Sequence, residues 1–378
     1  MPIKNNHFMI YLLTIILPTV MVLFFTGTAN PADEEEVKTS RYNPQTDGLV
    51  VHEWGVISCA KTPSATAGHP RIPAFVKMGR FQPAPYLPPE DEPAAADKPV
   101  IYFYSPKEQA IKVEVKIPSR CDTIYHWVPG RASIKGADSS WVSVEWNNLK
   151  ISGPEDKGEI SPVDDCHWWN TARNTAANFL EVAGRKLSFR EKFLFYEVTG
   201  LPFSKPCYIQ WDQDSCKIQL ATCREFSVED QSDAAPDPES DKSIRRVPKP
   251  RFLETKLHDV FALRIFQGKG TVVFTGKIDL SKKDERQIQM DPEVTMNLRS
   301  KTWRSATEGR LKKVLAKAGL YGDEIKSMTQ IWNDDFFQKD GLRIIYRMSG
   351  KKYDELFPLN ISEKAESIKR VMLVTIEG

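Results

Sequence analysis

Apolar and charged residues alternate without a break at positions 111–117, which read Ile-Lys-Val-Glu-Val-Lys-Ile. A period of two is typical of a strand that buries one face and exposes the other. A continuous apolar run, Val-Ile-Tyr-Phe-Tyr at 100–104, lies just before it, and Ser105-Pro106-Lys107 between the two suits a turn. We therefore predict a β-hairpin on a half-buried sheet.

The first apolar run after the N-terminal region is Leu-Val-Val-His-Glu-Trp-Gly-Val-Ile-Ser-Cys at 49–59. Its β-branched residues favour a strand. Successive side chains of a strand point to opposite faces, so we expect His52 to share a face with Trp54 and Glu53 to lie on the other face. Gly55 is where a local bend or bulge would fit.

Other short apolar runs extend the β pattern through much of the chain. We predict strands at 125–128, 141–146, 193–198, 207–211, 217–220, 260–266 and 271–275, with turns at 212–214 and 267–270. Between them, apolar residues at helical spacing predict a helix at 171–183 that ends before Gly184.

The C-terminal part combines helices with strands. Apolar residues recur at helical spacing over 311–318 and over 325–332, where Asp323 is suited to cap the second helix. Apolar runs at 342–346 and 371–376 predict strands. We therefore predict an α+β fold, with a largely antiparallel, sandwich-like β-sheet and a C-terminal helical hairpin packed on sheet.

The N-terminus has the layout of an export signal. Lys4 precedes an almost wholly apolar run at 8–25, and Thr-Gly-Thr-Ala at 26–29 provides small residues for cleavage. We expect a signal peptide at 1–29. The alternative is an uncleaved membrane anchor at 8–25, because about 18 apolar residues can just cross a bilayer. Either way the protein would be extracytoplasmic, periplasmic or secreted, and this segment would engage the membrane at least during export.

Composition divides the remainder of the chain. Residues 30–48 are acidic and polar and predict a flexible leader. A β-rich domain follows at 49–226. Residues 227–250, rich in proline and acidic pairs, form either a linker or a surface excursion, and 251–378 is an α+β part that folds either separately or together with 49–226.

Charge argues against one class of partner. The chain has 52 Lys and Arg against 50 Asp and Glu, a formal net charge of +2. It therefore lacks the basic surplus of nucleic-acid-binding proteins, and we expect no nucleic-acid partner.

The chain has six cysteines. In an oxidising compartment an even number suggests disulfides. Cys207, Cys216 and Cys223 are closest in sequence and are the first candidates for one local bridge.

No catalytic motif of fixed spacing is present, because the chain lacks H-E-x-x-H, H-x-H, C-x-x-C and G-x-S-x-G. His52, Glu53 and His167 are nonetheless the best catalytic candidates. If the fold brings His52 and His167 together with Asp164 and Asp165, the set would suit zinc or another divalent metal ion. The alternative is that His52 is hydrogen-bonded within its strand and that His167 lies at the start of a helix.

Nine tryptophans invite a carbohydrate-binding interpretation, because flat indole rings stack on sugars. Trp168 and Trp169 are adjacent and cannot both point inward on one face. One of them is therefore a candidate contact for a glycan or an envelope component. The alternative is that these rings pack in the core.

Several stretches occur together in an order that carries a resemblance. They are His-Glu-Trp-Gly at 52–55, Lys-Pro-Val-Ile-Tyr-Phe-Tyr at 98–104, His-Trp-Trp at 167–169, Glu-Lys-Phe-Leu-Phe-Tyr at 191–196, and Gly-Leu-Arg-Ile-Ile-Tyr at 341–346 followed by Asp-Glu-Leu-Phe-Pro-Leu at 354–359. From Val51 onward the chain resembles an uncharacterised family of exported bacterial proteins with a His-Glu-Trp-Gly stretch near the mature N-terminus. It has Val56-Ile57 where the family has Thr-Phe. The resemblance implies one co-folded unit and no particular activity or cofactor.

Three functions are compatible with these patterns. The first is a non-catalytic envelope or extracellular binding or structural protein, because no catalytic motif is present. The second is a metal-dependent hydrolase centred on His52, Glu53 and His167. The third is a carbohydrate-binding or carbohydrate-active protein that uses exposed tryptophans.

Overall fold

The computed structural model describes residues 39–59, 77–79, 94–119, 121, 123–127, 132–137, 141–160, 168–182, 190–201, 203, 205–222, 254–291 and 293–378. The chain divides into two units, Met1–Asp33 and Glu34–Gly378, and every described residue belongs to the second. The predicted signal peptide or anchor and the predicted linker at 227–250 therefore lie outside the described residues.

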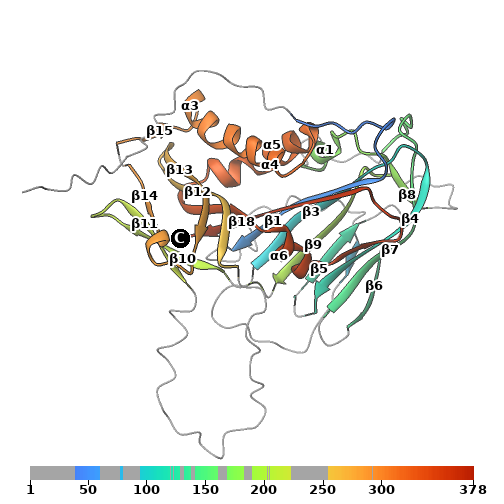
Figure 1. The fold of residues 1–378 in the computed structure, drawn as a ribbon, viewed down its shortest axis with the longest axis horizontal. Coiled ribbons are helices and arrows are strands. Elements are labelled where there is room, and N and C mark those ends of the chain that lie inside the picture. The colour runs from blue at the N-terminus through green and yellow to red at the C-terminus, as the bar shows by residue number, and fades with distance from the viewer. Residues whose placement is uncertain are drawn as a thin grey trace, which may run out of the picture. The chain divides into compact units, whose positions relative to one another are not determined.

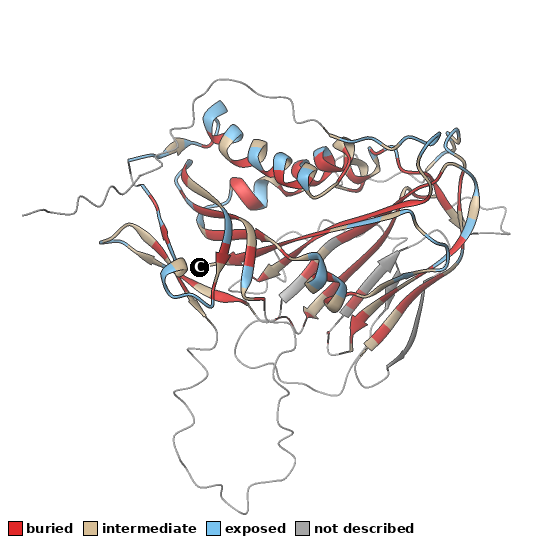
Figure 2. Cartoon of the chain, in the orientation of Figure 1, coloured by how far each residue is buried: buried red, intermediate tan, exposed pale blue. Residues whose placement is uncertain are grey.

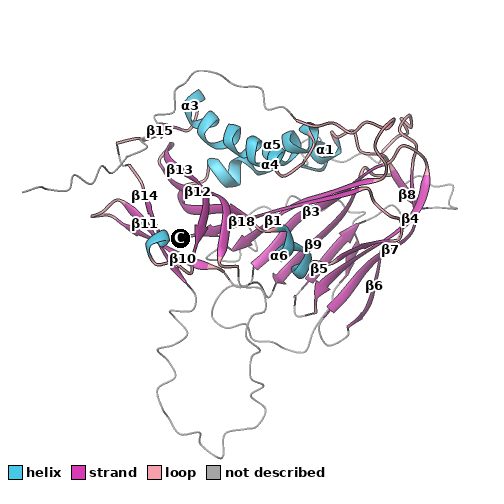
Figure 3. Ribbon diagram, viewed as in Figure 1, coloured by secondary structure: helices cyan, strands magenta, loops and turns pink. Residues whose placement is uncertain are grey.

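Three β-sheets form the framework of the described structure (Figures 1 and 3). The largest contains, in spatial order, β15 (Met296–Asn297), β13 (Lys269–Asp279), β12 (Lys256–Phe266), β16 (Gly341–Arg347), β18 (Ser367–Glu377), β1 (Val50–Cys59), β3 (Ala94–Tyr104), β9 (Phe193–Leu201), β5 (Thr123–Trp127) and β2 (Lys77–Gly79). The second contains β17 (Leu359–Ile361), β4 (Gln109–Pro118), β7 (Trp141–Ile151) and β6 (Ala132–Ala137), with β8 (Leu180–Val182) paired to β7. The third contains β10 (Cys207–Asp212), β11 (Lys217–Thr222) and β14 (Gln287–Gln289).

Among the described residues, helices are fewer than strands. They are α1 (Trp168–Arg173), α3 (Lys301–Arg304), α4 (Arg310–Lys317), α5 (Gly322–Phe337) and α6 (Gly350–Leu356). Strands make up 48% of the structure and helices 21%. Every pair of described strands is antiparallel except β1 with β18. The predicted α+β class with largely antiparallel sheets is thus confirmed. Within the described residues, each helix is too short or too polar to cross a membrane.

Strand β1 joins the two predicted parts of the chain. It pairs in parallel with β18, from Val50 opposite Ser367 to Cys59 opposite Ile376, and in antiparallel with β3. Strands from 251–378 therefore lie in the same sheet as strands from 49–226, and they meet at the β18–β1 boundary.

Both faces of this sheet are buried, as Figure 2 shows for the strands at its centre. Trp54 packs with Leu315 of α4 and Met328 of α5 in what we call the helix-side core. Val51 packs with Val113 of β4 in what we call the sheet-side core. Because apolar residues alternate between the two cores, β1 is covered on both faces.

The predicted hairpin at 100–117 is wrong, although both of its strands form. β3 belongs to the ten-stranded sheet, whereas β4 pairs with β7 and β17 in the second sheet. The chain changes sheets at Ser105, whose backbone N–H donates to the Asn178 side chain at 2.8 Å. A tertiary contact therefore replaces the turn that the local pattern favoured.

The helix predicted at 171–183 is also wrong in extent. α1 ends at Arg173, and Leu180 begins β8. Between them, the Asn178 side chain donates to the carbonyls of Ser105 and Ser152, at 3.2 and 2.7 Å. These bonds fix the segment in an irregular conformation, and tertiary context overrides helical spacing.

The β12–β13 hairpin and the segment before β1 were also predicted from the sequence. The hairpin of β12 and β13 is confirmed, with Gln267 and Gly268 at φ of 50° and 75°, as a two-residue turn between twisted strands requires. The last part of the predicted flexible leader, in contrast, makes defined contacts. Tyr42 lies 5.5 Å from the ring of Tyr104, and its hydroxyl donates to the carbonyl of Gly48 at 3.2 Å.

Candidate functional site

His52 and Glu53 lie near the centre of the ten-stranded sheet, and their side chains point to opposite faces. His52 contacts α5 on the helix side, whereas Glu53 contacts Tyr196 on the sheet side. The alternation expected from the sequence is therefore confirmed. The register shift near Gly55 adds a residue to β3 rather than to β1, so it does not bring the two side chains together.

His52 is held by a carboxylate from α5. Its Nδ1 lies 2.8 Å from Oε2 of Glu324, and because a carboxylate accepts, Nδ1–H donates. The two side chains are 2% and 0% exposed. The ring of Tyr321 lies 4.4 Å from the imidazole. The pair thus fixes the first turn of α5 over β1, in a place that solvent does not reach.

Neutral phenols surround this pair. Burial, and then the charge of Glu324, raise the pKa of Tyr104 well above 10. Burial, followed by the charges of Asp47 and Glu324, raises the pKa of Tyr321 to about 12. Both hydroxyls therefore keep their protons at neutral pH, and neither supplies a nucleophilic phenolate.

On the other face, Glu53 is the centre of a second buried cluster. The hydroxyl of Tyr196 donates to Oε1 and Nε of Arg370 donates to Oε2, both at 2.6 Å. Arg370 also donates to Asp354 at 2.8 Å, and its guanidinium lies 4.1 Å from the ring centre of Tyr353. Burial is the largest single influence on the pKa of Arg370 and lowers it, but the charges of Glu53, Tyr353 and Tyr196 together with the hydrogen bond to Glu53 outweigh burial, so the pKa rises. Glu53 and Arg370 form a buried ion pair.

The sequence pattern singled out neither Glu324 nor Arg370. Glu324 is the third residue of α5 and accepts from the backbone N–H of Tyr321 at 2.7 Å, so a carboxylate three residues after the N-cap was the available signal. Arg370 gave no local signal, because its partner Glu53 lies 317 residues away.

The predicted helix cap has a different identity. α5 begins one residue before Asp323, and Tyr321 occupies the N-cap position. Asp323 instead accepts from the backbone N–H of Glu324 at 3.0 Å and from that of Ala176. Asp323 therefore connects the first turn of α5 to the segment that follows α1.

The proposed metal ligands are only partly described. His167, Asp164 and Asp165 lie outside the described residues, whereas His52 lies within them. Helix α1 begins at the next residue, Trp168, and packs on α5. In the described part of the chain, no three His, Cys, Asp or Glu side chains lie close enough together to hold a metal ion.

The adjacent residues Trp168 and Trp169 differ in burial. Trp169 is fully buried, and its indole N–H donates to Glu191 at 2.6 Å. Arg173 also donates to Glu191, at 2.7 Å. Burial raises the pKa of Glu191, and Arg173 opposes this. Trp168 is half-buried beside Phe193, so in this conformation it is the member of the pair that can reach a ligand.

The disulfide candidates are not bonded to one another where they are described. Cys207 begins β10 and Cys216 lies in the turn before β11, and no disulfide is present among the described residues. Cys223 lies outside them.

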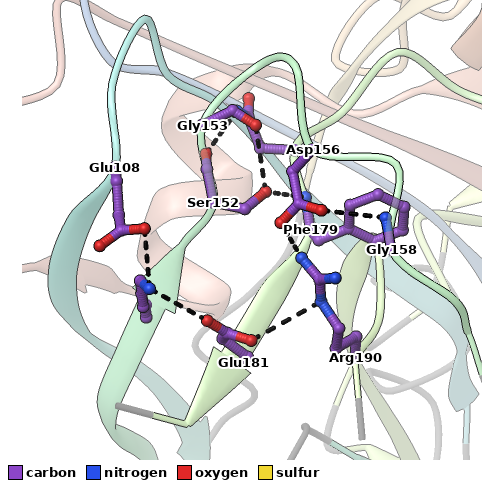
Figure 4. Close-up of polar contacts among 10 residues, drawn as sticks. Glu108, Ser152, Gly153, Asp156, Gly158, Phe179, Glu181 and Arg190 are labelled. Atoms are coloured by element: carbon purple, nitrogen blue, oxygen red, sulfur yellow. Dashed lines mark hydrogen bonds and ion pairs between the residues drawn. The ribbon is translucent and has the colours of Figure 1, made fainter. Parts of the chain in front are cut away.

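A separate ionic network connects β7, β8 and the segment around Arg190 (Figure 4). Lys150 lies 2.7 Å from Glu108 and 3.3 Å from Glu181. Arg190 pairs with Asp156 and lies 3.6 Å from Glu181. Its members are partly exposed, and such pairs contribute little to stability individually. The network orients the loop after β7 and contains no buried acid or base.

Comparison of the chain with models of protein families, with curated proteins and with solved structures gave no match.

Proposed function

We propose that this chain is an exported protein of the cell envelope or the extracellular space that acts as a non-catalytic binding or structural protein. The proposal rests mainly on the burial and hydrogen bonding of the two catalytic candidates that the structure describes, His52 and Glu53. His52 is 2% exposed and bound to Glu324, while Glu53 is 0% exposed and bound to Tyr196 and Arg370. A catalytic acid or base must reach the proton it transfers, and neither side chain does so.

The proposal extends to the family and to the finer architecture. We propose that the chain belongs to the exported bacterial family that it resembles, and the His-Glu-Trp-Gly stretch at 52–55 supports this. The sheet-side core between the two larger sheets supports a sandwich-like arrangement, and the contact of α4 with α5 supports a helical hairpin on the opposite face.

The test is an assay of the purified chain for activity and for metal. We expect no turnover of generic esterase, phosphatase, peptidase or glycoside substrates, with or without added Zn²⁺ or Mn²⁺, and no stoichiometric metal by mass spectrometry. We also expect His52→Gln to lower the free energy of unfolding by about 1–3 kcal/mol, because glutamine carries its amide donor one bond farther out than Nδ1 and leaves Glu324 without a well-placed buried donor.

His258→Gln is the matched control, because His258 is only half-buried on β12 and should change stability by less than about 0.5 kcal/mol. Turnover that His52→Gln abolishes without lowering the melting temperature would overturn the proposal. That result would favour the metal-dependent hydrolase instead.

A further inference from the structure

Within the ten-stranded sheet, the first half of β18 has no described partner strand on the side that faces β16. β16 covers β18 only from Leu373 to Glu377, and the last bond between them runs from the N–H of Met348 to the carbonyl of Met372. The chain then turns away into α6. Among the described strands, none pairs with this side of β18 before Met372.

The backbone groups at this edge belong to two residues. Along β18, the carbonyl of Met372 and the N–H of Gly378 bond toward β16. Because successive residues of a strand direct their N–H and C=O to alternate sides, the even-numbered residues face that side. Ile368 and Arg370 therefore present their backbone N–H and C=O groups to the open edge.

A cleft of about 490 Å³ lies along the same stretch. Its lining includes Gly350 and Asp354 of α6, Leu359 of β17, and Ile368, Lys369 and Arg370 of β18. Its volume falls within the roughly 300–1,000 Å³ of ligand sites. Ile368 is 45% exposed, one of few large apolar side chains so exposed in the described structure. The cleft thus combines open backbone groups with an apolar wall.

The charges around the cleft cancel. The positive charges of Lys369 and Arg370 are balanced by the negative charges of Asp354 and Glu53. Both carboxylates already pair with Arg370. A strongly charged ligand such as a phosphate has no net attraction here. A neutral ligand that brings carbonyl acceptors and an apolar side chain fits this chemistry.

We propose that the edge of β18 at Ile368–Arg370 is a docking site for an extended peptide segment of another protein, which adds as a short strand. The added segment lies in line with β16 and runs antiparallel to β18. Its backbone bonds to Ile368 and Arg370, and an apolar side chain packs on Ile368 and Leu359. This is the mode in which a peptide extends a sheet. The inference rests on the proposed binding role and names its site and class of partner.

The first experiment uses an array of random heptapeptides probed with the full chain. We expect a subset with alternating apolar residues to bind, and Ile368→Pro to weaken that binding at least tenfold. Proline removes only the N–H that faces the open edge, because bonds to β1 come from the odd-numbered residues of β18. Ile368→Thr keeps the N–H and is the control for the side chain, and Phe266→Ala is the control for a distant exposed apolar residue.

The second experiment uses only the wild-type chain, so it does not depend on a variant that folds. Hydrogen exchange at the amides of Ile368 and Arg370 should be fast in the free protein and at least tenfold slower with a selected peptide. A peptide methylated on its alternate backbone nitrogens should neither bind nor protect them.

Three results would overturn the proposal. An array without any peptide that prefers wild type to Ile368→Pro would remove the docking site. Protection of both amides in the free monomer would mean that a segment of the same chain covers the edge. Protection that accompanies dimerisation would assign the edge to a second copy. These results differ from failure of the proposed function, which would be seen as turnover of a substrate.

Discussion

Glu53 shows how a single buried residue depends on distant parts of the chain. Its two oxygens accept from Arg370 of β18, which pairs directly with β1, and from Tyr196 of β9, which is separated from β1 by β3. An ion pair of this kind is not by itself a gain in stability, since desolvation opposes the Coulomb attraction. Removing one partner, however, leaves the other charge buried without compensation.

We predict that Arg370→Met lowers the free energy of unfolding by about 3–5 kcal/mol, because it leaves the Glu53 carboxylate buried and unpaired. Urea denaturation measures this. The double variant Glu53→Gln/Arg370→Met should recover more than half of the loss, since no buried charge remains. Lys351→Met, at a side chain that is 86% exposed, is the control and should change little. A loss of under about 1 kcal/mol in Arg370→Met would refute the argument.

The buried tyrosines predict a loss of stability at alkaline pH. Burial is the largest cause that raises the pKa of Tyr104, Tyr196 and Tyr346 well above 10, and the pKa of Tyr321 rises to about 12. In the unfolded chain these groups lose protons near the usual value of 10.0. Unfolding therefore releases protons above pH 10, and the free energy of unfolding falls as pH rises.

For Tyr321 the window of this loss is pH 10 to 12. Urea denaturation at steps between pH 8 and 12 measures the loss, and absorbance at 295 nm reports phenolate. Tyr321→Phe should show a smaller decline in that window than the wild-type chain. A free energy of unfolding that stays level up to pH 12 would show that the phenols are solvated.

At the scale of residues, the sequence predicted to which face of β1 the side chains of His52 and Glu53 point, but not which residues they contact. Strand alternation correctly separated His52 from Glu53, because it depends only on neighbouring residues. It could not supply Glu324 or Arg370, because both are brought to β1 by tertiary pairing. The polar residues were thus identified without the contacts that decide their role.

At the scale of elements, β1 depends on close approach to β3. A Cβ placed on Gly55 would lie 3.0 Å from Cα of Pro99 and 3.3 Å from the side chain of Met372. The extra residue that β3 carries near Pro99 brings its backbone against this position. Glycine is therefore required here by space, since nothing about the turn chemistry of the segment demands it.

We predict that Gly55→Ala lowers the free energy of unfolding by about 1–3 kcal/mol, the usual cost of overpacking a core. Gly276→Ala is a matched control in β13, because a Cβ there would meet nothing within 4 Å. The measurement is the shift in urea midpoint at unchanged m-value. Equal effects of the two substitutions would show that the approach of Pro99 relaxes easily.

Elements themselves were better predicted than their pairing. Periods of two and runs of β-branched residues located β1, β3, β4, β12 and β18, because these signals are local. The partner of each strand is not local, and the pattern wrongly joined β3 to β4. The helix expected at 171–183 failed for the same reason, since Asn178 bonds to two distant carbonyls.

At the scale of the whole molecule, the β1–β18 pair ties the N-terminal and C-terminal parts into one sheet. Glu34–Gly378 is one compact unit, and residues of both parts pack in each of the two cores. Such a unit has no internal boundary at which one part could unfold and leave the other buried.

We predict a single calorimetric transition for this unit, with the calorimetric and van't Hoff enthalpies equal within about 10%. A fragment of residues 49–226 expressed alone should lack cooperative unfolding, because β1 would lose β18. A fragment of 49–226 that unfolds with its own sharp transition, or two transitions in the intact chain, would restore the two-domain interpretation.

The parallel pairing of β1 with β18 also limits how early the large sheet can form during synthesis. Glu53 and Arg370 are 317 residues apart in the chain. Ribosomes add about 5–20 residues per second, so β1 waits roughly 15 to 60 s for its neighbour to be made. During that interval β1 has no partner along the side that β18 will occupy, so the ten-stranded sheet cannot be completed until the last strand has been made.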